Sequence, residues 1–141
     1  MSIYKIKTTF DSKLKSFFTS GDAGDVSIVF YENTDINSNP RQTFISSFLR
    51  MGEPSTAGCG KDAFNKQVGI YQINVNTPLH IGSGPALIIA DAVANEFKRG
   101  TKYDVDDFEI TIQKAYVSKS IVDSTHYMIP VTIQFYAYTS N

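Results

Sequence analysis

The sequence predicts an α+β fold with a single twisted, mixed and largely antiparallel sheet, two helices packed on one face of that sheet, and a long C-terminal β-hairpin. Two segments repeat apolar residues every three or four positions, as amphipathic helices do. Several other segments alternate apolar and polar residues, as half-buried strands do. No linker or internal repeat divides the 141 residues. Residues 1–141 are therefore expected to form one domain around one core.

The two helices are predicted over Ile3–Thr19 and over residues 84–99. In the first, the apolar residues at helical spacing are Ile3, Ile6, Phe10, Leu14, Phe17 and Phe18. In the second, Pro85 lies in the first turn and Gly100 follows the last residue, which are positions that these residue types favour. This second helix is expected to contact Tyr71, Ile73 and Val75 of the sheet through Leu87, Ala90, Val93, Ala94 and Phe97.

Alternation predicts strands over residues 26–30, 71–77, 108–117 and 129–138. Residues 43–50 have apolar pairs four apart, as in a helix, but the segment is short, aromatic and β-branched, so a strand is favoured. The last two strands are expected to form the hairpin, with a projecting tip within residues 118–127. Residues 52–65 are glycine-rich and lack periodicity, which predicts a loop of the length that is often functional.

The composition argues against several broad classes of protein. A net charge of −1 and a pI near 6.1 are not those of a protein whose main work is to hold nucleic acid. The single cysteine, Cys59, excludes an intramolecular disulfide framework. The longest apolar run, residues 86–90, is too short to span a membrane, and the N-terminus lacks the apolar run of a signal peptide. No membrane association is expected.

The side chains that could carry chemistry do not form a convincing active site. The segment 82–84 is glycine-rich and precedes a helix, but it lacks the lysine and hydroxyl residue of a phosphate loop. Cys59, His80 and His126 are far apart in the sequence, so a catalytic pair or a metal site is not expected. The acidic cluster that begins at Asp104 lacks the turn glycine of a calcium loop, and a solvated turn is the preferred interpretation. We therefore expect no enzyme activity, no metal and no cofactor.

One stretch of the sequence resembles a known family. Residues 69–78 read Gly-Ile-Tyr-Gln-Ile-Asn-Val-Asn-Thr-Pro, and a Gly-x-Gly turn at residues 82–84 follows. The next helix contains the pair Ala90-Asp91 and closes with Phe97. This arrangement resembles the tail terminator (tail completion) proteins of long-tailed bacteriophages of the siphovirus kind.

The resemblance implies a structural virion protein with no catalytic residues. Such proteins form a homo-oligomeric ring, usually a hexamer, that caps the tail tube, ends its polymerisation and forms the surface to which the head joins. The implied partners are the chain itself, the tail tube protein and a head-completion or connector protein, with genomic DNA only passing through the lumen. The implied location is the head-proximal end of the virion tail, after synthesis in the bacterial host cytoplasm.

Interaction residues are expected on the basic face of the first helix, in the glycine-rich loop, in the acidic cluster and near the hairpin tip. They are Lys5, Lys13, Gly58, Lys61, Asp104, Asp106, Asp107, Lys119 and Asp123. The lysines of the helix are expected to meet the acidic cluster of a neighbouring subunit. The alternative functions are another neck or head–tail connector component, or a small ligand-binding domain or enzyme. The last of these should show a concave site at Cys59 or at the acidic cluster.

Overall fold

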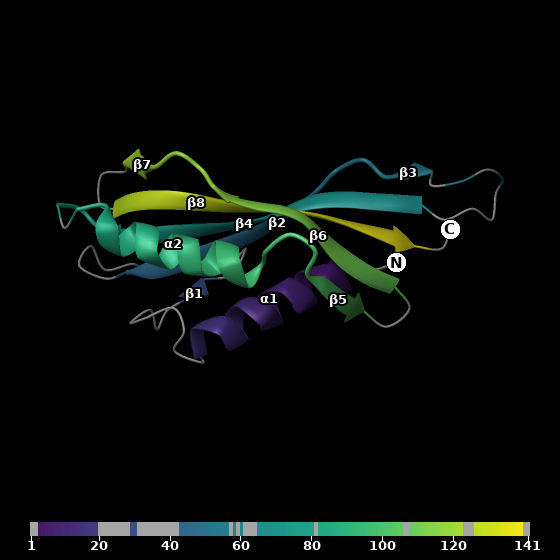
Figure 1. Cartoon of the computed structure of the whole chain (residues 1–141), viewed down its shortest axis with the longest axis horizontal. Coiled ribbons are helices and arrows are strands. Elements are labelled where there is room, and N and C mark those ends of the chain that lie inside the picture. Colours follow the sequence, from purple (N-terminus) through teal and green to yellow (C-terminus); the bar gives the residue numbers. More distant parts are fainter. Residues whose placement is uncertain are drawn as a thin grey trace.

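The structure is a computed structural model that describes residues 3–19, 29–30, 43–56, 58, 60, 65–80, 82–105, 108–122 and 126–139. The elements in chain order are α1 (Ile3–Thr19), β1 (Val29–Phe30), β2 (Phe44–Met51), β3 (Ser55–Thr56), β4 (Asn65–Pro78), α2 (Gly84–Glu96), β5 (Lys102–Val105), β6 (Phe108–Val117), β7 (Ile121–Val122) and β8 (His126–Thr139). Both helices lie on the same side of one long sheet (Figure 1). The predicted fold class is confirmed.

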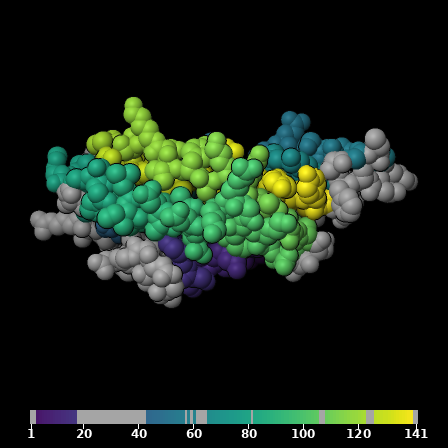
Figure 2. Space-filling model, in the orientation of Figure 1, coloured from purple at the N-terminus to yellow at the C-terminus, as the bar shows by residue number. Residues whose placement is uncertain are grey.

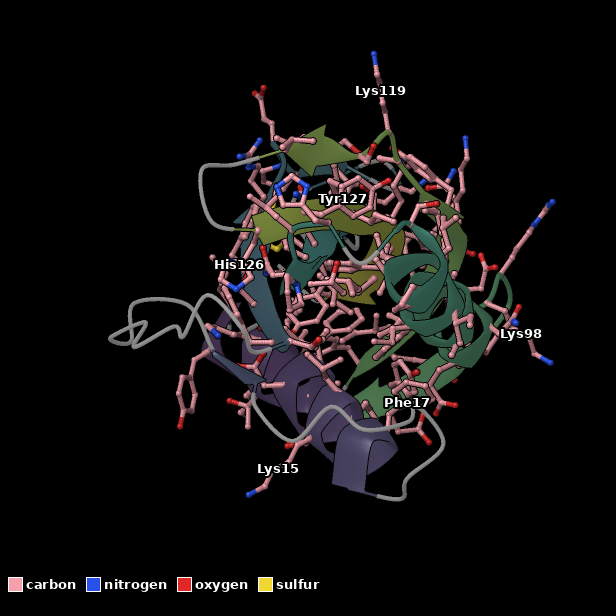
Figure 3. The ribbon with its side chains drawn as sticks, turned by 90° about the vertical axis from the view of Figure 1, so that its left-hand side faces the viewer. Lys15, Phe17, Lys98, Lys119, His126 and Tyr127 are labelled. Atoms are coloured by element: carbon pink, nitrogen blue, oxygen red, sulfur yellow. The ribbon has the colours of Figure 1, made fainter. Side chains whose placement is uncertain are left out.

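The sheet has the strand order β1-β2-β4-β8-β6-β5, with β3 paired to β4 and β7 paired to β8. The pairing of β1 with β2 is parallel, and the other described pairs are antiparallel. The sheet is therefore mixed and largely antiparallel, as expected. Seen along its length, the sheet curls around the side chains of the core, and α1 and α2 close the open side (Figure 3).

The two central strands, β4 and β8, explain the strongest alternation in the sequence. They pair over their full lengths, from Asn65 opposite Thr139 to Pro78 opposite His126. The apolar positions of both strands point to the helices and are almost fully buried: Tyr71, Ile73, Val75, Ile129, Val131, Ile133 and Phe135. The β4 strand begins six residues earlier than predicted, because polar residues at its first positions hid its alternation.

Helix α1 packs through the apolar stripe that the sequence predicts. Ile6, Phe10 and Leu14 have no exposed surface, whereas Tyr4 on the other side of the helix is 77% exposed. The ring of Phe10 lies 4.8 Å from the rings of both Tyr71 and Phe135, measured between centroids. Phe10 thus connects α1 to the two central strands, and this contact decides where the helix sits on the sheet.

Helix α2 contacts the sheet through a narrower face than predicted. Ala86, Ala90, Val93 and Phe97 are fully buried, but Leu87 is 41% exposed, so its predicted place in the core is wrong. Leu87 lies about 100° round the helix from Ala86 and falls outside the buried stripe. The helix ends at Glu96, before the predicted residue 99, and the N–H of the capping residue Phe97 donates to the Val93 carbonyl at 3.2 Å. In the space-filling view, α2 and the strands that follow it cover this side of the molecule (Figure 2).

The hairpin of β6 and β8 is present, but the described part of its end does not project. Ile121 and Val122 pair with Met128 and Tyr127 of β8. The Ser118 N–H also donates to the Pro130 carbonyl at 2.8 Å. Because β4 extends along the other side of β8 as far as His126, the segment lies against the sheet. The expectation of a projecting tip is therefore wrong for residues 118–122, 126 and 127, and residues 123–125 lie outside the described part of the chain.

Besides β7, two short strands of the described part were not predicted. Within the expected loop at residues 52–65, Ser55–Thr56 pairs with the start of β4. The edge strand β5 pairs with β6 over Lys102–Val105, where charged residues hide the alternation. Of the strand predicted over residues 26–30, only Val29–Phe30 lies in the described part, and the structure assigns it to β1.

The hydroxyl of Ser47 leads to the first testable prediction. Ser47 is 3% exposed on β2, and its Oγ has no hydrogen-bond partner among the described residues. An unsatisfied buried hydroxyl costs stability, so Ser47→Ala should raise the free energy of unfolding by about 1 kcal/mol. Urea titration measures this change. Ser46→Ala on the same strand is the control and should change little, and a destabilised Ser47→Ala would contradict the prediction.

Candidate protein-interaction site

A groove lies between α1 and the edge strand β5. It has a volume of about 350 Å³ and is lined by Tyr4, Lys5, Thr8, Thr9, Ser12, Lys13, Asp104 and Val105. We call it the α1–β5 groove. It contains an exposed aromatic ring, two lysines and a carboxylate. Tyrosine and charged groups of both signs are typical of surfaces that recognise proteins.

Aromatic packing places the two walls of the groove beside each other. The ring of Tyr103 on β5 makes edge contacts with Phe10 of α1 at 6.1 Å and with Phe97 at 6.3 Å, measured between centroids. Because neighbouring side chains of a strand alternate, Asp104 is exposed while Val105 is buried. On α1, the polar residues follow the helical spacing on the side away from Phe10. The groove is thus a direct result of how the core is packed.

The threonines of the groove are bonded to the helix that bears them. Thr8 Oγ1 donates to the Tyr4 carbonyl at 2.7 Å, and Thr9 Oγ1 donates to the Lys5 carbonyl at 2.8 Å. This backbone bonding uses the hydroxyl protons that would otherwise be offered to a ligand. Recognition at the groove therefore depends mainly on the tyrosine and the charged side chains.

The basic residues of α1 have different roles. Lys7 Nζ lies 2.6 Å from Asp11 Oδ2, and Asp11 also accepts a hydrogen bond from the Tyr71 hydroxyl. These contacts tie the helix to β4 and are structural. Lys13 Nζ instead lies 5.3 Å from the centre of the Tyr103 ring, at the groove. A cation over an aromatic face is attracted by the ring, so this contact orients Lys13.

The structure brings together three of the nine predicted interaction residues. Lys5, Lys13 and Asp104 line the same groove of one subunit. Gly58 is exposed close to β3, and Lys119 points away from the body of the molecule (Figure 3). The other predicted residues lie outside the described part of the chain; they are Lys61, Asp106, Asp107 and Asp123. Contact between these lysines and the acidic cluster of a neighbour stays a prediction.

Sequence reasoning did not identify Tyr4 as part of the site. Its ring is 77% exposed although it lies among the apolar residues of the helix. The sequence does contain a signal, because Tyr4 falls outside the stripe of residues three and four apart. A large aromatic residue left outside the buried stripe is a reasonable candidate for a contact with a partner.

The residues considered for catalysis do not assemble in the described part of the chain. His80 is exposed in a turn with φ 68°, whereas His126 is 3% exposed and its ring lies 4.9 Å from that of Phe44. Cys59 lies outside the described residues. Among the residues described, no three side chains of the metal-ligating types lie together. The helices described here also include none with the length and apolar character needed to cross a membrane.

Tyr103 leads to a prediction about alkaline pH. Burial, assisted by the negative charge of Glu96, raises the pKa of Tyr103 from 10.0 to about 12. Between these two values the unfolded chain loses the phenol proton and the folded chain keeps it, so the unfolding free energy should fall as pH rises. Below pH 10 both states keep the proton, and this loss is absent.

The test compares the wild type with Tyr103→Phe. Urea midpoints measured from about pH 9 to about pH 12 should fall less steeply for the variant, because it lacks the group that titrates differently in the two states. Identical slopes for the two proteins would contradict the assigned pKa of Tyr103.

Comparisons with known proteins identify a family and two structures with a similar fold. Residues 12–135 match a protein family described as "Phage tail terminator protein". A solved structure without a descriptive name aligns with 100% of this chain and 96% of its own, with a TM-score of 0.74 and 15% identity. A chain of a structure titled "Virion of native gene transfer agent (GTA) particle" aligns over 96% of this chain and 94% of its own, with a TM-score of 0.56 and 15% identity. No curated protein matches the sequence.

Proposed function

Since the chain belongs to the phage tail terminator family, we propose that it caps the tail tube as a homo-oligomeric ring, ends tube polymerisation and forms the surface to which the head joins. The family match over residues 12–135 is the observation that carries this proposal, because it extends from within α1 into β8. The family consists of structural proteins and not of enzymes. Membership of the family therefore supports a structural role in a phage tail, and capping of the tail tube is the more specific function that we propose.

A ring of identical subunits needs two different surfaces on each subunit, so that one surface binds the other on the next copy. The α1–β5 groove is one candidate. The second is the β7 edge, where Ile121 is 52% exposed and Val122 is 69% exposed. Figure 1 shows β7 and β5 towards opposite ends of the sheet, which suits a head-to-tail contact. We propose that these two surfaces meet around a ring of six subunits.

The other partners follow from the proposed position in the particle. One face of the ring would contact the tail tube protein, and the other would contact a head-completion or connector protein. Genomic DNA would pass through the lumen during packaging and ejection. This places the protein at the head-proximal end of a siphovirus tail, as part of the virion.

Deletion of the gene, followed by complementation, tests the proposal. The deletion should give tails of uncontrolled length that do not join heads. A Lys5→Glu/Lys13→Glu variant should fail to restore normal tails, because it reverses the charge of the groove. Lys98→Glu/Arg99→Glu is the matched control, since both residues are exposed beyond α2 and lie outside the groove; it should restore them.

The outcomes separate the possible roles. Tails of fixed length that fail to join heads would exclude capping and would assign the chain to another part of the neck. Normal infectious particles without the gene would exclude both roles. Full complementation by the groove variant would leave capping intact and would exclude the groove as a required contact.

A further inference from the structure

The sheet face opposite the helices has an unusual charge distribution. We call it the outer sheet face; it is formed by the outward positions of β2, β4, β8 and the second half of β6. Strands β2, β4 and β8 contain no aspartate or glutamate. This face carries three cations: Arg50 of β2, Lys66 of β4 and Lys114 of β6. It is therefore positively charged, although the whole chain has a net charge of −1.

Each of these three cations lies over an aromatic ring on the same face. The Arg50 guanidinium carbon is 5.4 Å from the centre of the Phe48 ring. Lys66 Nζ is 5.1 Å from the ring of Tyr136. Lys114 Nζ is 5.0 Å from the ring of Tyr116. Such contacts restrict long side chains, so less conformational freedom is lost when the cations bind a ligand.

Strand register places two of the cations in one row across the sheet. Arg50 is opposite Ile70, Ile70 is opposite Gln134, and Gln134 is opposite Lys114. Three strand spacings of ~4.8 Å separate the backbones of Arg50 and Lys114 by about 14 Å. This separation is similar to the ~12 Å width of the major groove of duplex DNA, which phosphates border on both sides.

A hollow of about 250 Å³ lies along this row. Its lining includes the guanidinium-bearing Arg50 and the amides of Gln113 and Gln134. The row therefore carries a concave surface that combines a cation with amide donors. These are the groups that proteins use to contact phosphate oxygens.

We infer that the outer sheet face binds the phosphate backbone of double-stranded nucleic acid, with Arg50, Lys66 and Lys114 as the main contacts. The cations cover the faces of their own aromatic partners, so these rings are poorly placed to stack on unpaired bases. Binding should therefore be independent of base sequence and should not favour single strands. Glu53, just after β2, and Glu109, whose Oε1 is 3.6 Å from Lys102 Nζ, lie at the margins of this face.

The inference does not depend on tube capping, because it concerns a different surface from the groove. Three phosphate contacts give a moderate, salt-sensitive affinity: log K should fall with log salt with a slope of about −2.7. Such weak contact agrees with a near-neutral chain that does not hold nucleic acid as its main task.

The test is fluorescence anisotropy with a short random-sequence DNA duplex between about 50 and 200 mM salt. The variant Arg50→Ala/Lys66→Ala/Lys114→Ala should bind at least about tenfold more weakly at the lower salt concentration, with a salt slope near zero. The matched control is Lys15→Ala/Lys98→Ala/Arg99→Ala, which removes the same charge from α1 and from the residues that follow α2. Figure 3 shows Lys15 and Lys98 pointing away from the body of the molecule. This control should bind within about twofold of the wild type.

Several outcomes would overturn the inference. They are equal weakening by both triple variants, no binding by the wild type, tighter binding to a single strand than to the duplex, or binding to a poly-glutamate peptide but not to DNA. Circular dichroism checks that the triple variant folds. If it does not, Lys114→Ala alone should reduce the magnitude of the salt slope by about 0.9, and an unchanged slope would equally contradict the proposal.

Discussion

Replacing Phe10 with alanine is expected to lower the free energy of unfolding by about 3–5 kcal/mol. The Phe10 ring is fully buried and contacts aromatic rings of β4, β8 and β5 and the ring of Phe97, which directly follows α2. Its removal leaves a cavity at the point where the helices meet the sheet, and the rigid rings around it cannot collapse easily into the space. Urea unfolding followed by circular dichroism measures the loss.

Tyr4→Ala is the matched control, because it removes an aromatic ring from the same helix at a position that is 77% exposed. Its effect on stability should stay within about 0.5 kcal/mol. Equal effects of the two substitutions would show that Phe10 is not the centre of the core. Tyr4→Ala also has a functional use, since it removes the aromatic ring from the α1–β5 groove without unfolding the protein.

Replacing Ile73 with alanine is expected to cost about 2–5 kcal/mol. Ile73 has no exposed surface and lies on the inward side of β4, between Ser47 of β2 and Val131 of β8. Ile70→Ala is the comparison, because Ile70 lies on the same strand but on the outer sheet face and is half-buried. A chemical denaturation series should show a clearly larger loss for Ile73→Ala, and the reverse order would show that the assigned inward face is wrong.

The parts of the fold that sequence predicts well are those in which one physical requirement dominates. Tyr71, Ile73 and Val75 alternate with polar residues because only the inward side of β4 packs against the helices, whereas its outward side carries Gln72, Asn74 and Asn76. The stripe of Ile6, Phe10 and Leu14 likewise follows from a helix with a single buried side. These patterns were sufficient to predict the largely antiparallel sheet and the common face of the two helices.

The parts that sequence predicts poorly depend on tertiary packing. Leu87 is apolar and lies within a broad apolar helix, so periodicity alone places it in the core, whereas the curled sheet contacts only the neighbouring stripe. The edge strand β5 carries Lys102 and Asp104 on exposed positions, which conceals its pairing with β6. Such charges are common on edge strands, where they discourage pairing with other chains.

The candidate site was predicted only in part, for a similar reason. Lys5 and Lys13 lie on the same helix, so the sequence alone places them near each other. Their proximity to Asp104 depends on tertiary packing, because the contact between Phe10 and Tyr103 positions α1 against β5. The structure also explains two of the residues that carry the family resemblance. Gly69 is small because the Phe135 ring occupies the space of its side chain, and Tyr71 stacks on Phe10.

Tube length in a purified system tests the central claim most directly. Tail tube protein would be allowed to polymerise with and without this chain, and electron microscopy would record the tube lengths and the structure at their ends. Capping predicts shorter tubes with a ring at one end. The proposed groove contact predicts longer tubes without rings when Lys5→Glu/Lys13→Glu replaces the wild type. Unchanged lengths and bare tube ends with an excess of the wild-type protein would contradict the proposed function.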